Sequence, residues 1–292
     1  MIGFTTIKRV LLATASLGFA AHAAAANLTL DVYNPGTQAI FPVTSVLVSG
    51  EKDAILVDAQ FGKSQAEQVV EKIRASGKHL TTIYISHGDP DYYFGLDTLT
   101  KAFPDAKVLA SQPTVDHINK TVEGKLAFWG PKMGADVPAK TIVPGVLKGD
   151  SLMLEGQKLQ VIGLDGKQPD RSFVWIPSLK AVVGGVVVAD DIHVWMADTQ
   201  TAQSHADWLA TLQSIKTLKP KTVVPGHYLG DGSRSLASVK FTADYIKAFD
   251  AETAKAKDSV ALIAAMKKRY PTLGEESSLE LSAKVAKGEM QW

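Results

Sequence analysis

The chain has 292 residues, and 46% of them are hydrophobic, which is enough for a sizeable core in one or two soluble domains. Its formal net charge is +1 and no basic block stands out, so neither a nucleic acid nor an anionic membrane surface is indicated as a partner. The absence of cysteine excludes disulfides, thiolate zinc sites and lipid attachment at Cys. Any metal ion would therefore need histidine and carboxylate ligands.

The first 26 residues predict a secretory signal peptide. Lys8 and Arg9 form a short basic region, an apolar run follows at 10–21, and small residues fit cleavage after Ala23 or Ala26. The run is too short for a spanning helix with flanking anchors, although a retained anchor is the alternative. We therefore expect a periplasmic or secreted protein with no stable membrane anchor after cleavage. Loss of the two basic side chains leaves 29 basic against 30 acidic ones.

Short β-branched runs and one amphipathic pattern describe the next part of the chain. The helix predicted at 63–77 carries four apolar side chains on one face and ends in Gly77. Pro113 stands at the start of another predicted helix. The remaining predicted elements here are strands at 27–34, 44–50, 53–59, 79–86 and 106–111 and helices at 95–103 and 113–129.

The second half alternates in the same way and then becomes helical. Hairpins are predicted at 151–164 and 171–189, followed by a helix at 205–218 and a strand at 221–226. From Ser233 the chain is rich in Ala, Lys, Glu and Leu, which predicts two or three helices packed on the body. We therefore expect one mixed domain at 27–230 with a helical C-terminal extension at 231–292.

A possible ligand cluster follows the strand predicted at 79–86. His87, Asp89 and Asp91 alternate along the loop "HGDPDYYFG", so their side chains can point the same way. This His-x-Asp-x-Asp loop between a strand and a helix resembles the His-x-His-x-Asp-His signature of the metallo-β-lactamase superfamily. Asp58 and His227 resemble, respectively, the supporting aspartate that precedes the signature and the last histidine ligand. Residues 166–185 resemble the segment from the third histidine to the bridging aspartate, so the match covers about 28–230 in four ordered pieces.

The resemblance implies a fold and a metal site. The fold is an α+β four-layer αββα sandwich, metallo-β-lactamase-like, with the metal site at one edge between the sheets. Four of the seven ligand positions differ here: Asp89 replaces the second histidine, Tyr92 and Lys167 replace two further histidines, and Val186 replaces the bridging aspartate. Two metal ions thus lack their bridge, and at most one zinc is expected, held by His87, Asp89, Asp91 and His227.

Three residues are predicted to take part in the chemistry. Asp91 orients the attacking water, and Tyr92 offers its hydroxyl to a substrate oxyanion. Lys167 is predicted to replace the first metal by an ion pair with Asp89. The alternatives are that the two aspartates cap and turn the loop, that His87 is only a loop residue, that His227 supports a neighbouring ligand or packs, and that Lys167 is a solvated lysine.

Histidines elsewhere in the chain carry weaker predictions. His193 either faces a substrate or packs in the core, whereas His79, His117 and His205 are predicted at the surface.

Three functions follow from these residues. The first is an exported hydrolase with a single zinc that acts on a small ester, lactone or amide. The alternative is a metal-free, catalytically silent binding protein that keeps the fold. A third is metal-independent chemistry by Lys167, Tyr92 and the aspartates, for which the sequence shows no convincing pair of nucleophile and base. Each would have a small molecule as its partner, and the sequence does not predict an oligomeric state.

Overall fold

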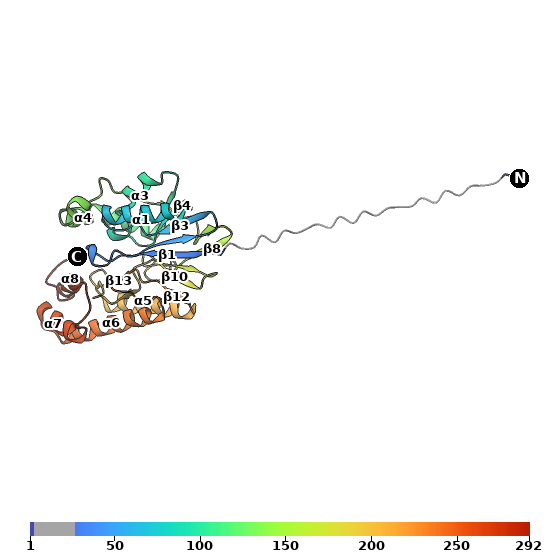
Figure 1. Ribbon diagram of the computed structural model, residues 1–292. Helices are drawn as coiled ribbons and strands as arrows, with labels where there is room; N and C mark the ends of the chain where they lie inside the picture. The colour runs from blue at the N-terminus through green and yellow to red at the C-terminus, as the bar shows by residue number, and fades with distance from the viewer. Residues whose placement is uncertain (3–26) are drawn as a thin grey trace.

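Two β-sheets lie face to face at the centre of the protein, and helices cover both outer faces (Figure 1). The computed structural model describes residues 1–2 and 27–292, so all but the first two residues of the predicted signal peptide lie outside the described residues. The first sheet has the order β1-β2-β3-β4-β5-β6 and the second the order β12-β10-β9-β8-β7, while β11 pairs with β13. The predicted four-layer order of helices, two sheets and helices is confirmed.

The strands agree closely with the predicted runs and hairpins. Neighbours from β1 to β3 and from β7 to β10 are antiparallel, whereas β3 to β6 are parallel and are joined by helices. The strands are β1 (Thr29–Tyr33), β2 (Ser45–Ser49), β3 (Asp53–Val57), β4 (His79–Ile85), β5 (Lys107–Ala110), β6 (Gly145–Val146), β7 (Ser151–Leu154), β8 (Gln157–Ile162), β9 (Phe173–Ile176), β10 (Ala181–Val183), β11 (Ala189–Asp190), β12 (Thr222–Val223) and β13 (His227–Tyr228).

The helices form the two outer layers. On one side of the sheets lie α1, α3 and α4, and on the other lie α5 and α6 (Figure 1). The predicted glycine stop of α1 is confirmed, because Gly77 adopts a left-handed conformation with φ 67°. The helices are α1 (Lys63–Ser76), α2 (Pro90–Tyr93), α3 (Leu96–Ala102), α4 (Gln112–Met133), α5 (Ala202–Thr217), α6 (Leu236–Lys255), α7 (Ser259–Arg269) and α8 (Glu276–Ala286), with 3-10 turns at Gly36–Gln38 and Gly134–Asp136.

Alternation along β3 explains the layering. Ile55 and Val57 are buried between the two sheets, whereas Ala54 and Leu56 are buried against the α1 and α3 side. Successive side chains of a strand point to opposite faces, so a run that is apolar at every position is buried on both faces. The continuous apolar run of β3 therefore places it in the middle of the first sheet, and its end carries Asp58 towards the site.

The C-terminal helices share a core with the second sheet. Tyr245 and Phe249 of α6, Leu262 of α7 and Leu279 of α8 belong to one apolar cluster with Val182 of β10. This packing brings the start of α8 to the edge where α4 and β13 also lie (Figure 1). Among the described residues, no helix is both long and apolar enough to cross a membrane.

Candidate active site

Asp58 ties the ends of two neighbouring strands together. It adopts a left-handed conformation with φ 67°, and its carboxylate accepts hydrogen bonds from the Ser86 backbone N–H at 2.8 Å and the Ser86 hydroxyl at 2.7 Å. Further along the loop, a Cβ on Gly95 would lie 1.9 Å from the Ala59 carbonyl oxygen, so only glycine permits this approach. The predicted supporting role of Asp58 is confirmed, and the loop 86–95 is held at both ends.

Replacing Asp58 by asparagine should flatten the dependence of stability on pH. Burial raises the pKa of Asp58 from 3.8 to about 7, in spite of the hydrogen bonds from Ser86. The folded chain then holds this proton more tightly than the unfolded chain, so the free energy of unfolding falls as the pH rises from about 4 to 7. At about 1.4 kcal/mol per pKa unit, Asp58 accounts for up to about 4 kcal/mol of this fall. Urea unfolding at several pH values in that range should show a smaller fall for Asp58→Asn, and equal slopes for both proteins would contradict the prediction.

Asp89 is the centre of a buried ion-pair cluster. Its Oδ2 atom lies 3.1 Å from His87 Nε2, and its Oδ1 atom lies 3.3 Å from Lys125 Nζ and 3.8 Å from His117 Nε2. Burial alone raises the pKa of Asp89, but the Lys125 ammonium and His87 outweigh it and hold that pKa well below 3.8. His87 is fixed on its other side, where Nδ1 lies 3.0 Å from the Asp170 carbonyl oxygen. The carboxylate is thus ionised and already supplied with cationic partners.

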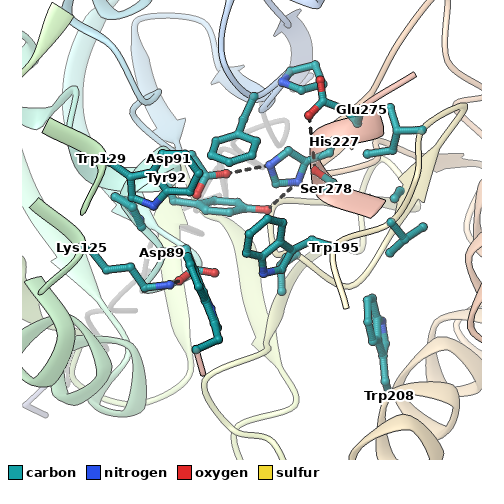
Figure 2. A pocket seen from close by; sticks show the side chains of 18 residues that line it. Asp89, Asp91, Tyr92, Lys125, Trp129, Trp195, Trp208, His227, Glu275 and Ser278 are labelled. Atoms are coloured by element: carbon teal, nitrogen blue, oxygen red, sulfur yellow. Dashed lines mark hydrogen bonds and ion pairs between the residues drawn. The ribbon is translucent and has the colours of Figure 1, made fainter. Parts of the chain in front are cut away.

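A second group of contacts joins Asp91, His227 and Tyr92. His227 Nε2 lies 2.7 Å from Asp91 Oδ2, and its Nδ1 lies 3.2 Å from the Tyr92 hydroxyl (Figure 2). Burial and the nearby Asp91 charge raise the pKa of Tyr92 well above 10.0, so the phenol keeps its proton. The protonated phenol donates to Nδ1, which puts the imidazole proton on Nε2, where it is donated to Asp91. Strand β13, paired with β11, places His227 for these contacts although 136 positions separate it from Asp91.

These groups open onto a pocket with aromatic walls. Figure 2 shows the Lys125 ammonium directed at Asp89, and Asp91 and Tyr92 both directed at His227. Phe41 packs edge-on against Trp129 at 5.0 Å, and Trp195 packs against Trp292 at 5.1 Å between ring centroids. The pocket is lined by Phe41, Pro42, Asp89, Pro90, Asp91, Tyr92, Lys125, Trp129, Val186, Ala189, Ile192, Val194, Trp195, Trp208, His227, Glu275, Ser278 and Trp292.

Asp198 fastens the aromatic wall beside Lys125. Its two carboxylate oxygens accept hydrogen bonds from the indole N–H of Trp195 at 2.6 Å and of Trp292 at 2.7 Å. The Lys125 ammonium lies 3.8 Å from Asp198 Oδ1 and 4.4 Å from the centre of the Trp292 ring. The wall is therefore positioned by polar contacts and offers apolar rings to a ligand.

The family is shown by a match that covers most of the site. Residues 39–227 match the model of the metallo-beta-lactamase superfamily. The chain belongs to this superfamily. The match includes the loop 86–95 and ends at His227, so the predicted resemblance is confirmed.

Similar proteins agree with the superfamily at low identity. The chain is 36% identical over 74 residues to the uncharacterized protein YobT of Bacillus subtilis, and 21% identical over 199 residues to a beta-lactamase-like protein 2 homolog of Caenorhabditis elegans. These alignments cover 25% and 67% of this chain but only 31% and 59% of the relatives. Among solved structures, a metallo-beta-lactamase from Pontibacter korlensis is similar with a TM-score of 0.55 and 20% identity over 75% of this chain and 93% of that one. The DIM-1 metallo-beta-lactamase gives 0.50 and 19% over 76% and 93%. At such identities the structures confirm the fold alone.

Superfamily members typically bind zinc, but the residues of this chain do not fit a metal ion. The four predicted ligands lie in the same region, yet they form two separate pairs, His87 with Asp89 and Asp91 with His227. No group of three His, Cys, Asp or Glu side chains in the described part of the chain is arranged to hold a metal. The Lys125 ammonium already lies 3.3 Å from the Asp89 carboxylate. Buried Val186 stands where the superfamily pattern has the bridging aspartate.

The predicted ion pair between Asp89 and Lys167 is wrong. Lys167 is exposed, and no ion pair within 4.0 Å involves it among residues 27–292. The loop between β8 and β9 turns twice, with backbone bonds from Gly166 N to Gly163 O and from Arg171 N to Gln168 O. These turns direct Lys167 outward and bring the Asp170 carbonyl and the Arg171 side chain inward. Lys125 of α4 takes the partner role that was assigned to Lys167.

Several residues of the site had a weak signal in the sequence or none. Lys125 and His117 lie two helical turns apart on α4 and so face the same side. The prediction that His117 is a surface residue is wrong, because it contacts both Asp89 and Asp170 from a side chain that is only 27% exposed. For His117 and Lys125, the only pattern in the sequence was their regular spacing on one face of α4. Arg171 and Trp292 had no such pattern.

Of the histidines outside the site, one differs from its prediction. His193 packs in the core, where its Nδ1 lies 3.1 Å from the Tyr245 hydroxyl. His205 was predicted at the surface and is buried, with its Nδ1 2.6 Å from Asp250 Oδ1. Asp250 lies on α6, so this contact depends on how α5 and α6 pack. His79 is exposed as predicted.

Proposed function

We propose that the chain is an exported hydrolase that acts on a small ester, lactone or amide with its own side chains instead of a metal ion. The observation that carries this proposal is the line of contacts from Asp91 through His227 to Tyr92 at the wall of an aromatic pocket. Membership of the metallo-beta-lactamase superfamily supports the reaction class. The signal-peptide pattern at 1–26 supports a periplasmic or secreted location.

Asp91 is the group that takes a proton from water. Its Oδ2 atom accepts the His227 Nε2–H at 2.7 Å, which leaves Oδ1 for a water molecule in the pocket that Asp91 lines. The water oxygen adds to the carbonyl carbon while its proton passes to Asp91. The tetrahedral intermediate then expels the alcohol or amine, which takes that proton with it.

Tyr92 acts on this chemistry through His227. Its hydroxyl proton is used in the 3.2 Å contact with His227 Nδ1, so the predicted contact between this hydroxyl and a substrate oxyanion is not part of the proposal. By donating to Nδ1, Tyr92 keeps the imidazole proton on the side that faces Asp91. Tyr92 is therefore a positioning residue, and Asp91 is the residue that meets the water.

Metal analysis tests the proposal directly. The mature protein, purified without chelator and incubated with zinc, should contain far less than one metal ion per chain. The reason is that the four predicted ligand residues are already paired with one another. Hydrolysis of a panel of aryl esters, lactones and nitrocefin should be unchanged by EDTA. One zinc per chain that is lost in His227→Ala, but kept in the exposed His79→Ala, would overturn the metal-free mechanism.

A binding protein without catalysis is the second candidate. It is favoured by the engagement of both His227 nitrogens and by the existing partners of Asp89. Because Trp129, Trp195 and Trp292 line the pocket, their fluorescence should report ligand binding in either case. A compound that changes this fluorescence and is recovered intact after long incubation, when no member of the panel is cleaved, would favour the binding protein.

A further inference from the structure

Lys125 brings a positive charge into the wall of the pocket. Its side chain is only 15% exposed, and its ammonium lies 3.3 Å from Asp89 Oδ1 and 3.8 Å from Asp198 Oδ1. A buried ammonium is costly unless carboxylates accompany it, and here two of them do. An ammonium has three N–H donors, so one remains after these two neighbours for an atom in the pocket that Lys125 lines.

Arg171 adds a second buried cation in the neighbourhood of Asp89 and Asp198. It is 5% exposed, and its guanidinium carbon lies 4.3 Å above the ring of Trp208. Its Nε and Nη2 atoms are buried and have no hydrogen-bond partner among the described residues. Burial lowers the pKa of Arg171 below its usual value, while the charges of Asp198, Asp170 and Asp89 act in the opposite direction. The site therefore holds two fixed cations that the sequence pattern of the superfamily does not predict.

The acidic side chains of the site explain why cations are needed. Asp89 and Asp91 are both buried, and Asp198 lies beside Asp89. Neighbouring carboxylates repel strongly inside a protein unless a positive charge lies between them. In a metal-binding relative, the metal ions supply this positive charge. Here the Lys125 ammonium lies next to the carboxylate that replaces a histidine ligand.

We propose that Lys125, supported by Arg171, is a built-in cation that replaces the charge of the superfamily's metal ions and donates its free N–H to the carbonyl oxygen of the substrate. The second half of this statement rests on the proposed hydrolase function, whereas the first half does not. Negative charge develops on the carbonyl oxygen when water adds to the carbon, and an ammonium in this aromatic-lined pocket stabilises it. The substrate class is then a small carbonyl compound with a flat apolar body that fits between the aromatic side chains.

Zinc binding by a restored site tests the replacement of charge. Asp89→His with Tyr92→His rebuilds the His-x-His-x-Asp-His pattern, and this double variant is compared with three others that add Lys125→Met, Lys125→Gln or Lys125→Arg. Zinc affinity, measured by competition with a coloured chelator, should be at least about tenfold tighter with Met or Gln than with Lys. Arg should be as weak as Lys, which separates charge from size.

The comparison requires that all four variants are folded. Thermal unfolding followed by circular dichroism confirms that each is folded, and the Gln variant serves if the Met variant is not. Equal zinc affinity in all folded variants, or no zinc binding in any of them, would overturn the replacement of charge.

Catalysis by single variants tests the contact with the substrate. In the otherwise unchanged protein, Lys125→Met should lower kcat at least about tenfold with a smaller change in KM, and Lys125→Arg should recover part of the loss. Equal kcat values in the wild-type and Met proteins would overturn the carbonyl contact. If the wild-type protein cleaves no ester, lactone or amide, the proposed function fails, and the zinc measurement still decides whether Lys125 replaces the metal charge.

Discussion

Replacement of Trp208 by alanine should lower the free energy of unfolding by roughly 4 kcal/mol. Trp208 is fully buried on α5, its indole N–H donates to the Val187 carbonyl at 2.8 Å, and the Arg171 guanidinium lies over its ring. Alanine would leave a large cavity, an unpaired carbonyl and a buried cation without its aromatic partner. Urea unfolding followed by circular dichroism measures the loss, which should appear with little change in the slope against urea.

The phenylalanine variant separates the contributions at this position. Trp208→Phe keeps an aromatic ring but removes the N–H donor, so it should cost roughly 1–2 kcal/mol, less than the alanine variant. A loss below about 1 kcal/mol for Trp208→Ala would show that the apolar cluster shared by the second sheet and the C-terminal helices does not depend on this residue.

The regular elements could be predicted because their signals are local. The helix α1 carries its apolar face and its stop in its own sequence, with Ile73 on the buried face and Gly77 just after the last turn. Strand β3 is apolar at every position after Asp53, and its burial on both faces follows from that run. Packing then confirms what the spacing already indicates.

The site was only partly predictable because its charges come from different layers. The loop 86–95 and His227 could be placed by resemblance, and the structure brings them together around Asp91. The partner of Asp89 could not be placed, since it depends on how α4 docks over the loop. The expectation that a cation faces Asp89 was correct in its chemistry and wrong in its residue, because turns in the loop before β9 direct Lys167 outward. The spacing of residues in the sequence does not show which side chains of this loop point inward.

The largest effect on catalysis should come from Asp91 and His227. Asp91→Asn keeps the shape of the side chain but cannot accept a proton from water, and His227→Gln removes the imidazole that Asp91 and Tyr92 hold. Each variant should lower kcat/KM for the best substrate of the ester and lactone panel by about 10² to 10⁴-fold. Initial rates are measured with the mature proteins at matched concentration. Thermal unfolding curves first confirm that each variant is folded.

The double variant shows whether the two residues act as one unit. If His227 works by holding Asp91, then Asp91→Asn combined with His227→Gln should be about as slow as the slower single variant, since the second change removes a group that has lost its partner. His79→Gln is the matched control, because this histidine is exposed and lies at the end of β4 that is opposite to the loop, and it should keep the wild-type rate. Losses that multiply in the double variant would mean that Asp91 and His227 contribute separately. Rates unchanged in both single variants would place the chemistry elsewhere in the pocket.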